Sequence, residues 1–254
     1  MFIIGLDGAT WDIIKPNIDK LPTFKKILSQ HDNYTISLQQ KPWSASVWCS
    51  MFSGKLPEEH NHLDFVKDGE VQTRNDVKVD FIWDILSRNN ISVKALNIPF
   101  IVPPYNYNIY FNPPGYGVPL TQEELNTEIT EITNKIVSVT GDSKPELFIA
   151  VYTALDKMSH LHWGGESLID YYIKIDKAVN KIFELDEKVL ILSDHGFTDY
   201  DKAPVQTLPK ITSTGNELKG DHHPDAIAIA KNIPFKVNQP IDVFNGLISY
   251  FNVK

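Results

Sequence analysis

The most regular feature of the chain is a series of short, continuous apolar runs, each followed by polar residues. Three of them cover Phe2–Leu6, Leu147–Tyr152 and Val189–Leu192. Runs this short and this uniformly apolar are typical of strands buried on both faces of a parallel sheet. Weaker patterns predict further strands over 34–38, Val93–Ile98 and 226–230.

Helical spacing of apolar residues separates these runs. It predicts helices over 11–18, 21–29, 46–52, 80–87, 121–139, 165–185 and 240–251. Strands that alternate with helices of this length predict an α/β fold, with three α/β/α layers around a mostly parallel central sheet. No Ser/Gly-rich or charge-rich stretch marks a linker, so residues 1–254 are expected to form a single domain.

The composition argues against nucleic acids and membranes as binding partners. Acidic residues outnumber basic ones and give a formal net charge of -8, which argues against a nucleic-acid-binding surface. The N-terminal apolar run is only a few residues long, and no basic amphipathic helix is present, so no membrane association and a cytoplasmic location are expected. The lone cysteine, Cys49, lies in an apolar helical stretch and is expected to be a buried structural thiol.

Each of the three apolar runs leads to an aspartate: Asp7, Asp156 and Asp194. In open α/β sheets, ligands bind beyond the carboxyl ends of the strands, so one crevice could receive all three. Asp7 and Asp156 each have a structural alternative as a helix cap, as does Ser44 before its helix. Taken as an ordered set, however, they indicate a functional site.

Histidines accompany these carboxylates. His160 follows Asp156 by four residues on what is expected to be the loop leaving the strand, and His195 is adjacent to Asp194. Such oxygen and nitrogen ligands suit zinc, or manganese as a second choice. The hypothesis is a pair of divalent ions roughly 4 Å apart. One is held by Asp7, Ser44, Asp194 and His195, and the other by Asp156, His160 and His222.

These segments resemble the alkaline phosphatase superfamily, and within it the type I phosphodiesterase/nucleotide pyrophosphatase branch. The resemblance rests on 5–12 (GLDGATWD), on 194–197 (DHGF), on 220–225 (GDHHPD), and on 44–54 with the following Pro57 and His60. It implies a minimal alkaline phosphatase-like core that hydrolyses small phosphoesters through a phosphoserine. It also implies Ser44 as the nucleophile, since counting back from Gly54 selects Ser44 over Ser46 and Ser50.

Some positions depart from the family pattern or leave alternatives open. Phe65 stands where nucleotide pyrophosphatases carry a phosphate-binding Asn, so a preference for nucleotides is left open. His222 is the expected ligand, with His223 as its competitor. The region 99–119, rich in Pro, Tyr and Asn, could contact substrate or could be a packed crossover loop.

Charge counting suggests which phosphoester is preferred. The positive charges of the two divalent ions are balanced by the negative charges of three carboxylates and the Ser44 alkoxide, so the site is near neutral before substrate binds. A monoester dianion would therefore need a further cation. The only arginines, Arg74 and Arg88, are not beside a motif, although a lysine such as Lys67 could serve. Diesters are therefore expected over monoesters. The alternatives are a phosphomutase or phosphotransferase that uses the same phosphoserine, and a catalytically silent metal-binding member; the oligomeric state is not determined by the sequence.

Overall fold

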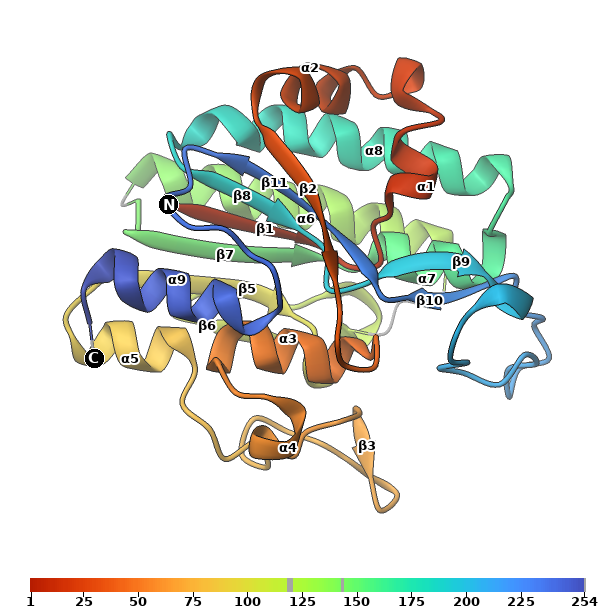
Figure 1. The fold of residues 1–254 in the computed structure, drawn as a ribbon, viewed down its shortest axis with the longest axis horizontal. Coiled ribbons are helices and arrows are strands. Elements are labelled where there is room, and N and C mark those ends of the chain that lie inside the picture. The colour runs from red at the N-terminus through yellow and green to blue at the C-terminus, as the bar shows by residue number, and fades with distance from the viewer. Residues whose placement is uncertain (118–120, 143, 254) are drawn as a thin grey trace.

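The computed structural model describes residues 1–117, 121–142 and 144–253. A seven-stranded sheet runs through the molecule in the order β2-β11-β8-β1-β7-β5-β6 (Figure 1). Its strands are β1 (Phe2–Leu6), β2 (Asp32–Ser37), β5 (Val93–Ile98), β6 (Tyr105–Tyr107), β7 (Leu147–Tyr152), β8 (Val189–Leu192) and β11 (Asp225–Lys231).

The centre of the sheet is parallel, as predicted, and its edges are antiparallel. β1 pairs in parallel with both β7 and β8, and β5 pairs in parallel with β7. β11 and β6 add antiparallel pairings, and β2 pairs antiparallel with β11. The three central strands β1, β7 and β8 are uniformly apolar because helices cover both of their faces. β2, whose burial alternates, is the outermost strand on its side.

Helices form the outer two layers and cover separate cores. Alternate side chains of β1 point to opposite faces, so Phe2 and Ile4 join one core while Ile3 joins the other. In Figure 1 α2, α6 and α8 lie over the first face, and α3, α5 and α9 lie over the second. The helices are α1 (Trp11–Ile14), α2 (Pro22–Gln30), α3 (Ser44–Ser53), α4 (Pro57–His60), α5 (Ile82–Arg88), α6 (Gln122–Asp142), α7 (Ala154–His162), α8 (Glu166–Ile182) and α9 (Ile241–Phe251).

Short elements lie outside the sheet. β9 (Gly196–Asp199) pairs antiparallel with β10 (Gly220–His223), and β3 (Val66–Lys67) with β4 (Glu70–Val71). Single turns of 3₁₀ helix occur at η1 (Ile18–Lys20), η2 (Pro114–Gly117), η3 (Phe183–Leu185) and η4 (Tyr200–Lys202). Among the helices of the described residues, none is both long enough and apolar enough to cross a membrane.

Several element boundaries differ from the sequence-based prediction. The helix expected over 11–18 ends at Ile14, because Pro16 cannot donate the next helical hydrogen bond. The helix expected from residue 46 begins at Ser44 instead. In the described part of the region 99–119, Tyr105 and Tyr107 lie in the edge strand β6 and pack against Trp83, whereas Tyr110 is exposed. Residues 118 and 119 of this region lie outside the described residues.

Candidate active site

The first aspartate of the candidate site, Asp7, directly follows β1 and is buried. The next residue, Gly8, turns the chain with φ +69°, and a side chain there would collide with Phe197. This turn directs the backbone N–H of Gly8 to the Asp194 carboxylate, 3.2 Å away. Trp48 of α3 donates its indole N–H to Asp7. The turn after β1 therefore holds the Asp194 carboxylate in place, and α3 holds the Asp7 carboxylate.

The second ligand pair lies on a helix, not on the loop that the sequence suggested. Asp156 is in the first turn of α7 and His160 is in its last turn. Residues four apart lie on the same face of an α-helix, so both side chains point in one direction. His160 Nε2 and Asp156 Oδ1 are 3.6 Å apart. The end of β7 therefore places the first turn of α7, with Asp156, at the site, and the helical repeat places His160 beside Asp156.

The β9–β10 hairpin decides between the two neighbouring histidines. His222 pairs opposite Phe197, two residues after His195, and is buried. His223 points to the other face of the hairpin, where its side chain is 37% exposed and its Nδ1 accepts a hydrogen bond from the Asp225 N–H. The structure therefore brings His222, and not His223, to the other predicted ligands.

The three predicted histidine ligands share one orientation. The Nδ1 atoms of His160, His195 and His222 lie 3.1, 2.9 and 2.5 Å from the backbone carbonyl oxygens of Gly220, Gly196 and Pro42 respectively. A carbonyl oxygen can only accept, so each neutral ring carries its proton on Nδ1. Each Nε2 then has a free lone pair, which is the arrangement in which histidine binds metals.

The Nε2 atoms of these rings lie close to one another and to a carboxylate. His160 Nε2 and His222 Nε2 are 3.1 Å apart, and His222 Nε2 is also 3.1 Å from Asp156 Oδ1. Among the described residues, Asp194 Oδ2 has no hydrogen-bond partner although it is fully buried. Clustered acceptors of this kind are stabilised by cations, so the residues fit a divalent metal site.

The nucleophile candidate lies against the other half of the cluster. Ser44 Oγ is 3.1 Å from His195 Nε2 and 3.5 Å from Asp7 Oδ1. His195 Nε2 is in turn 3.5 Å from Asp7 and 3.2 Å from Asp194. The rings of His195 and His222 stack with their centroids 3.6 Å apart, which joins the two halves. All seven predicted site residues therefore come together in space: Asp7, Ser44, Asp156, His160, Asp194, His195 and His222.

Burial and mutual repulsion perturb the carboxylates. Burial raises the pKa of Asp7 well above its usual range, and the charges of Asp194 and Asp156 raise it further. Burial also raises the pKa of Asp194 to about 7. Asp156 is buried too, but its histidine contacts outweigh this effect and lower its pKa. Three carboxylates crowded in this way favour bound positive charge.

Two further residues belong to this region and were missed by sequence reasoning. Asp221 is fully buried and lies with His160 and His222 in a group whose ligand atoms are within 4.8 Å of one another. Lys157, next to Asp156, lowers the pKa of Asp7 through its charge, and its ammonium is bonded to Thr153 Oγ1. Asp221 stands inside the quoted 220–225 segment, so that segment was the available signal.

The arginines lie elsewhere, as the sequence suggested. Arg74 donates to the Asp84 carboxylate and to two backbone carbonyls, and Arg88 pairs with Asp80. Lys67 is exposed on the β3 strand. None of these three has an interaction with the seven site residues among the contacts of the described chain.

The layered fold, with acidic and histidine side chains gathered at the carboxyl ends of parallel strands, defines a three-layer α/β/α enzyme core of the alkaline phosphatase-like kind. Residues 1–231 match the family described as type I phosphodiesterase / nucleotide pyrophosphatase, and the chain belongs to this family. It is accordingly a metal-dependent hydrolase of phosphoester bonds. A comparison of the sequence with curated proteins gives no match.

Solved structures support the fold. Murine ectonucleotide pyrophosphatase / phosphodiesterase 5 is 13% identical with a TM-score of 0.67, and the match covers 100% of this chain and 95% of that one. The human protein of the same name is 14% identical, with the same TM-score and coverage. Phosphonoacetate hydrolase from Sinorhizobium meliloti is 12% identical with a TM-score of 0.60, covering 85% of this chain and 58% of that one. At these identities the likeness concerns the fold.

Proposed function

We propose that this chain is a two-metal phosphodiesterase that uses Ser44 as its nucleophile. Asp7, Ser44, Asp194 and His195 hold one divalent ion in this proposal, and Asp156, His160 and His222 hold the other. The observation that carries the proposal is the set of Nε2 lone pairs and carboxylate oxygens that converge within 3.1–3.6 Å beside the Ser44 hydroxyl. Zinc is the proposed metal, with manganese second.

The position of Ser44 suits attack on a phosphate. It is the first residue of α3, whose N-terminal backbone N–H groups and dipole favour negative charge. Its side chain is nearly buried, and its hydroxyl faces His195 and Asp7. When bound, the two cations supply positive charge that lowers the pKa of the serine hydroxyl and stabilises the phosphate oxygens in the transition state.

The proposed reaction has two steps, formation of a phosphoserine and its hydrolysis. Ser44 Oγ forms a bond to phosphorus as the bond to the first alcohol breaks, and the proton lost by serine is balanced by the proton gained by the departing alcohol. Water cleaves the resulting phosphoserine diester, releases a phosphomonoester and restores the serine hydroxyl. With Nδ1 on a backbone carbonyl, each neutral histidine ring directs its Nε2 lone pair into the cluster, where it would hold a metal.

A diester is the proposed substrate because the region offers little additional positive charge. Arg74 and Arg88 are engaged in ion pairs with Asp84 and Asp80. The charge of Lys157 already interacts with Asp7, and its ammonium donates a hydrogen bond to Thr153. A diester carries one negative charge fewer than a monoester dianion, so it needs one positive group fewer.

The test compares two chromogenic esters with the zinc- or manganese-loaded protein. We expect a higher kcat/KM for bis-p-nitrophenyl phosphate than for p-nitrophenyl phosphate. The opposite order would contradict the diester assignment, and cleavage of neither ester would contradict the proposed function. Adding glycerol during turnover and analysing the product for glycerol phosphate distinguishes hydrolysis from phosphoryl transfer.

A further inference from the structure

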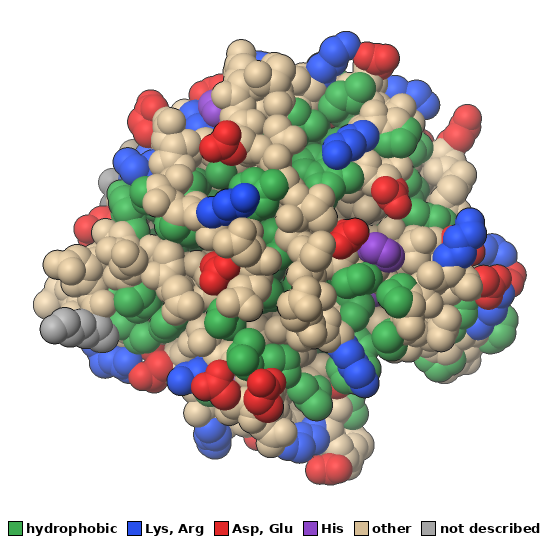
Figure 2. Space-filling model, viewed as in Figure 1, with side chains coloured by type: hydrophobic (Ala, Val, Ile, Leu, Met, Phe, Trp, Pro, Cys, Tyr) green, Lys and Arg blue, Asp and Glu red, His purple; other side chains and the backbone are tan. Residues whose placement is uncertain are grey.

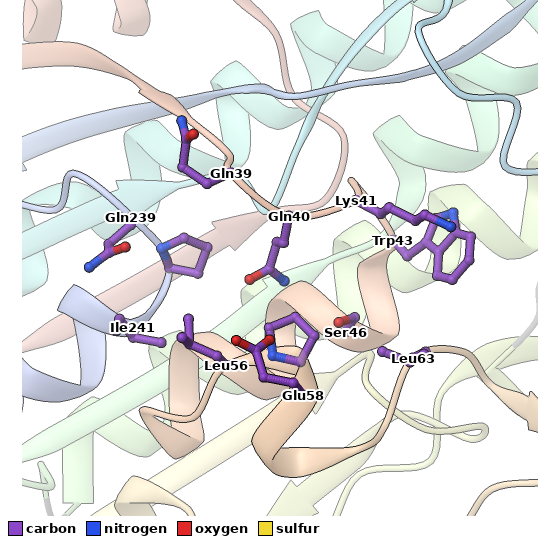
Figure 3. Close-up of a pocket in the computed structure, with 12 residues that line it drawn as sticks. Gln39, Gln40, Lys41, Trp43, Ser46, Leu56, Glu58, Leu63, Gln239 and Ile241 are labelled. Atoms are coloured by element: carbon purple, nitrogen blue, oxygen red, sulfur yellow. The ribbon is translucent and has the colours of Figure 1, made fainter.

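A pocket of about 570 Å³ lies beside the start of α3, between the segments 39–46, 56–63 and 239–241 (Figure 3). None of the seven site residues is among the described residues that line this pocket. The cluster itself has a direct neighbour outside the proposed ligand set, the buried carboxylate of Asp221. The contacts of this carboxylate indicate a role in the site.

Asp221 lies next to two of the three ligands proposed for the second ion. It immediately precedes His222 in β10, and its side chain is fully buried. One of its carboxylate oxygens lies within 4.8 Å of a ring nitrogen of His160 and of a ring nitrogen of His222. The carbonyl of Gly220, the residue before Asp221, accepts the Nδ1 proton of His160 at 3.1 Å. The strand that carries His222 therefore also places a carboxylate against the ligands.

Three hydrogen bonds fix the position of this carboxylate. Oδ1 accepts the backbone N–H of His222 at 2.8 Å and the hydroxyl of Thr207, and Oδ2 accepts the backbone N–H of Thr207 at 2.8 Å. An ionised carboxylate only accepts hydrogen bonds and has about four acceptor positions, so three of them are used by these donors. Asp221 is therefore held beside the ligands as an anion, without having to bind a metal itself.

The two proposed ligand sets differ in charge, and Asp221 lies on the side that has fewer anions. The first ion has three anionic ligands in the proposal, Asp7, Asp194 and the Ser44 alkoxide. The second ion has one, Asp156, together with two neutral histidines. Asp221 supplies a second negative charge beside these histidines, which matches the two positive charges of a divalent ion. Charges attract and repel each other more strongly at a buried site than in water, because the local dielectric constant is lower.

We propose that Asp221 is a specificity-determining residue that acts through its charge. Its carboxylate raises the affinity of the His160 and His222 side of the cluster for a divalent cation. The same charge repels a phosphate group that carries two negative charges more strongly than one that carries a single charge, so it disfavours monoester dianions. This assignment rests on the proposed phosphodiesterase function, and it adds a residue that sets the preference for diesters.

The first test measures zinc binding without turnover, by competition with a fluorescent chelator. Asp221→Asn removes the charge and keeps the size of the side chain, and it should raise the dissociation constant of one of the two ions by about 10- to 100-fold. Thr207→Ala removes the hydroxyl bonded to the same carboxylate but keeps the charge, so it should leave this constant near the wild-type value. An unchanged constant in Asp221→Asn, or an equal rise in both variants, would overturn the proposal.

Two further variants complete this comparison. Asp221→Ser removes the same charge with a smaller side chain, and it replaces Asp221→Asn if thermal unfolding shows that the Asn variant does not fold. Asp201→Asn is the matched control, because it removes a carboxylate that is 72% exposed and pairs with Lys210. This control should leave the zinc affinity unchanged.

The second test is a ratio of rates that a general loss of packing would not change. With zinc at saturating concentration, kcat/KM for p-nitrophenyl phosphate relative to bis-p-nitrophenyl phosphate should rise by about 10-fold in Asp221→Asn. Asp201→Asn should keep the wild-type ratio. An unchanged ratio in Asp221→Asn would overturn the role in specificity. If neither ester is cleaved but Asp221→Asn binds zinc more weakly as expected, the role of the charge in metal binding stands and the proposed reaction does not.

Discussion

His160 Nε2 and His222 Nε2 lie 3.1 Å apart, and each ring has its Nδ1 on a backbone carbonyl. Two neutral nitrogen lone pairs at this distance repel each other, whereas a cation bound by both is stabilised. We therefore predict that His222→Gln lowers the metal content from two ions per chain toward one, and lowers activity by more than about 100-fold. Elemental analysis of purified protein checks the metal content.

His223→Gln is the matched control for that variant. It changes the adjacent residue of the same strand, but its side chain points away from the cluster toward Asp225. Metal content and activity should stay near the wild-type values. Equal metal loss in both variants would contradict the assignment of His222 as the ligand.

Ser44→Ala should abolish turnover and leave metal content nearly intact. The remaining carboxylates and histidines still surround the ions, but the atom proposed to attack phosphorus is gone. Removal of a nucleophile lowers kcat on the order of 10⁴- to 10⁶-fold. Kinetics with bis-p-nitrophenyl phosphate measures this loss, and Ser53→Ala, at the far end of α3, should retain activity. A Ser44→Ala protein with most of its activity would show that another group attacks.

The buried His60 should make stability depend on pH. Burial, together with the neighbouring His62, lowers the pKa of His60 from its usual 6.5 to about 4. Between pH 4 and pH 6.5 the unfolded chain binds a proton at this histidine that the folded chain does not, so protonation favours unfolding. The stability that comes from neutral His60 is therefore fully present above pH 6.5 and is lost as the pH falls toward 4. Denaturant unfolding from pH 7 to 4 should show a smaller loss of stability in His60→Asn than in wild type. A His60 NMR titration midpoint near 6.5 would contradict the prediction.

Gly54, which ends the nucleophile helix, should not tolerate a side chain. Its φ is +67°, and a Cβ there would lie 2.3 Å from Phe244 of α9. Gly54→Ala should therefore lower the free energy of unfolding by about 2–5 kcal/mol, through left-handed backbone strain and overpacking. Gly141→Ala is the matched control, since nothing lies within 4 Å of its Cβ position on α6, and it should stabilise the protein by up to about 1 kcal/mol. Thermal or denaturant unfolding measures both.

The space-filling view shows how the types of side chain are distributed over one face of the molecule. On the face drawn in Figure 2, acidic and basic side chains are interspersed, and histidine is a small part of the surface. His160, His195 and His222 are themselves buried. The buried histidines would not be found from a surface charge pattern. In the sequence, His160 and His195 accompany aspartates that follow apolar runs, and His222 was identified through the resemblance of 220–225 to the family.

The sequence by itself determined the features that depend on local periodicity. Uniform apolar runs identified β1, β7 and β8, and the residues that follow them identified Asp7 and Asp194 at the strand ends. These predictions succeed because a strand buried between two helical layers must be apolar throughout, and the first polar residue after it marks the sheet edge.

Only the tertiary structure decided what depends on pairing between distant segments. The β9–β10 register placed His222 inward and His223 outward, and the helix after β7 placed His160 one turn beyond Asp156. The antiparallel edges and the pocket between residues 39–46 and 239–241 were likewise invisible in the sequence. The physical reason is that side-chain direction in a strand reverses with each residue, so a one-residue change of register exchanges the buried and exposed sides, and packing against the whole fold selects between them.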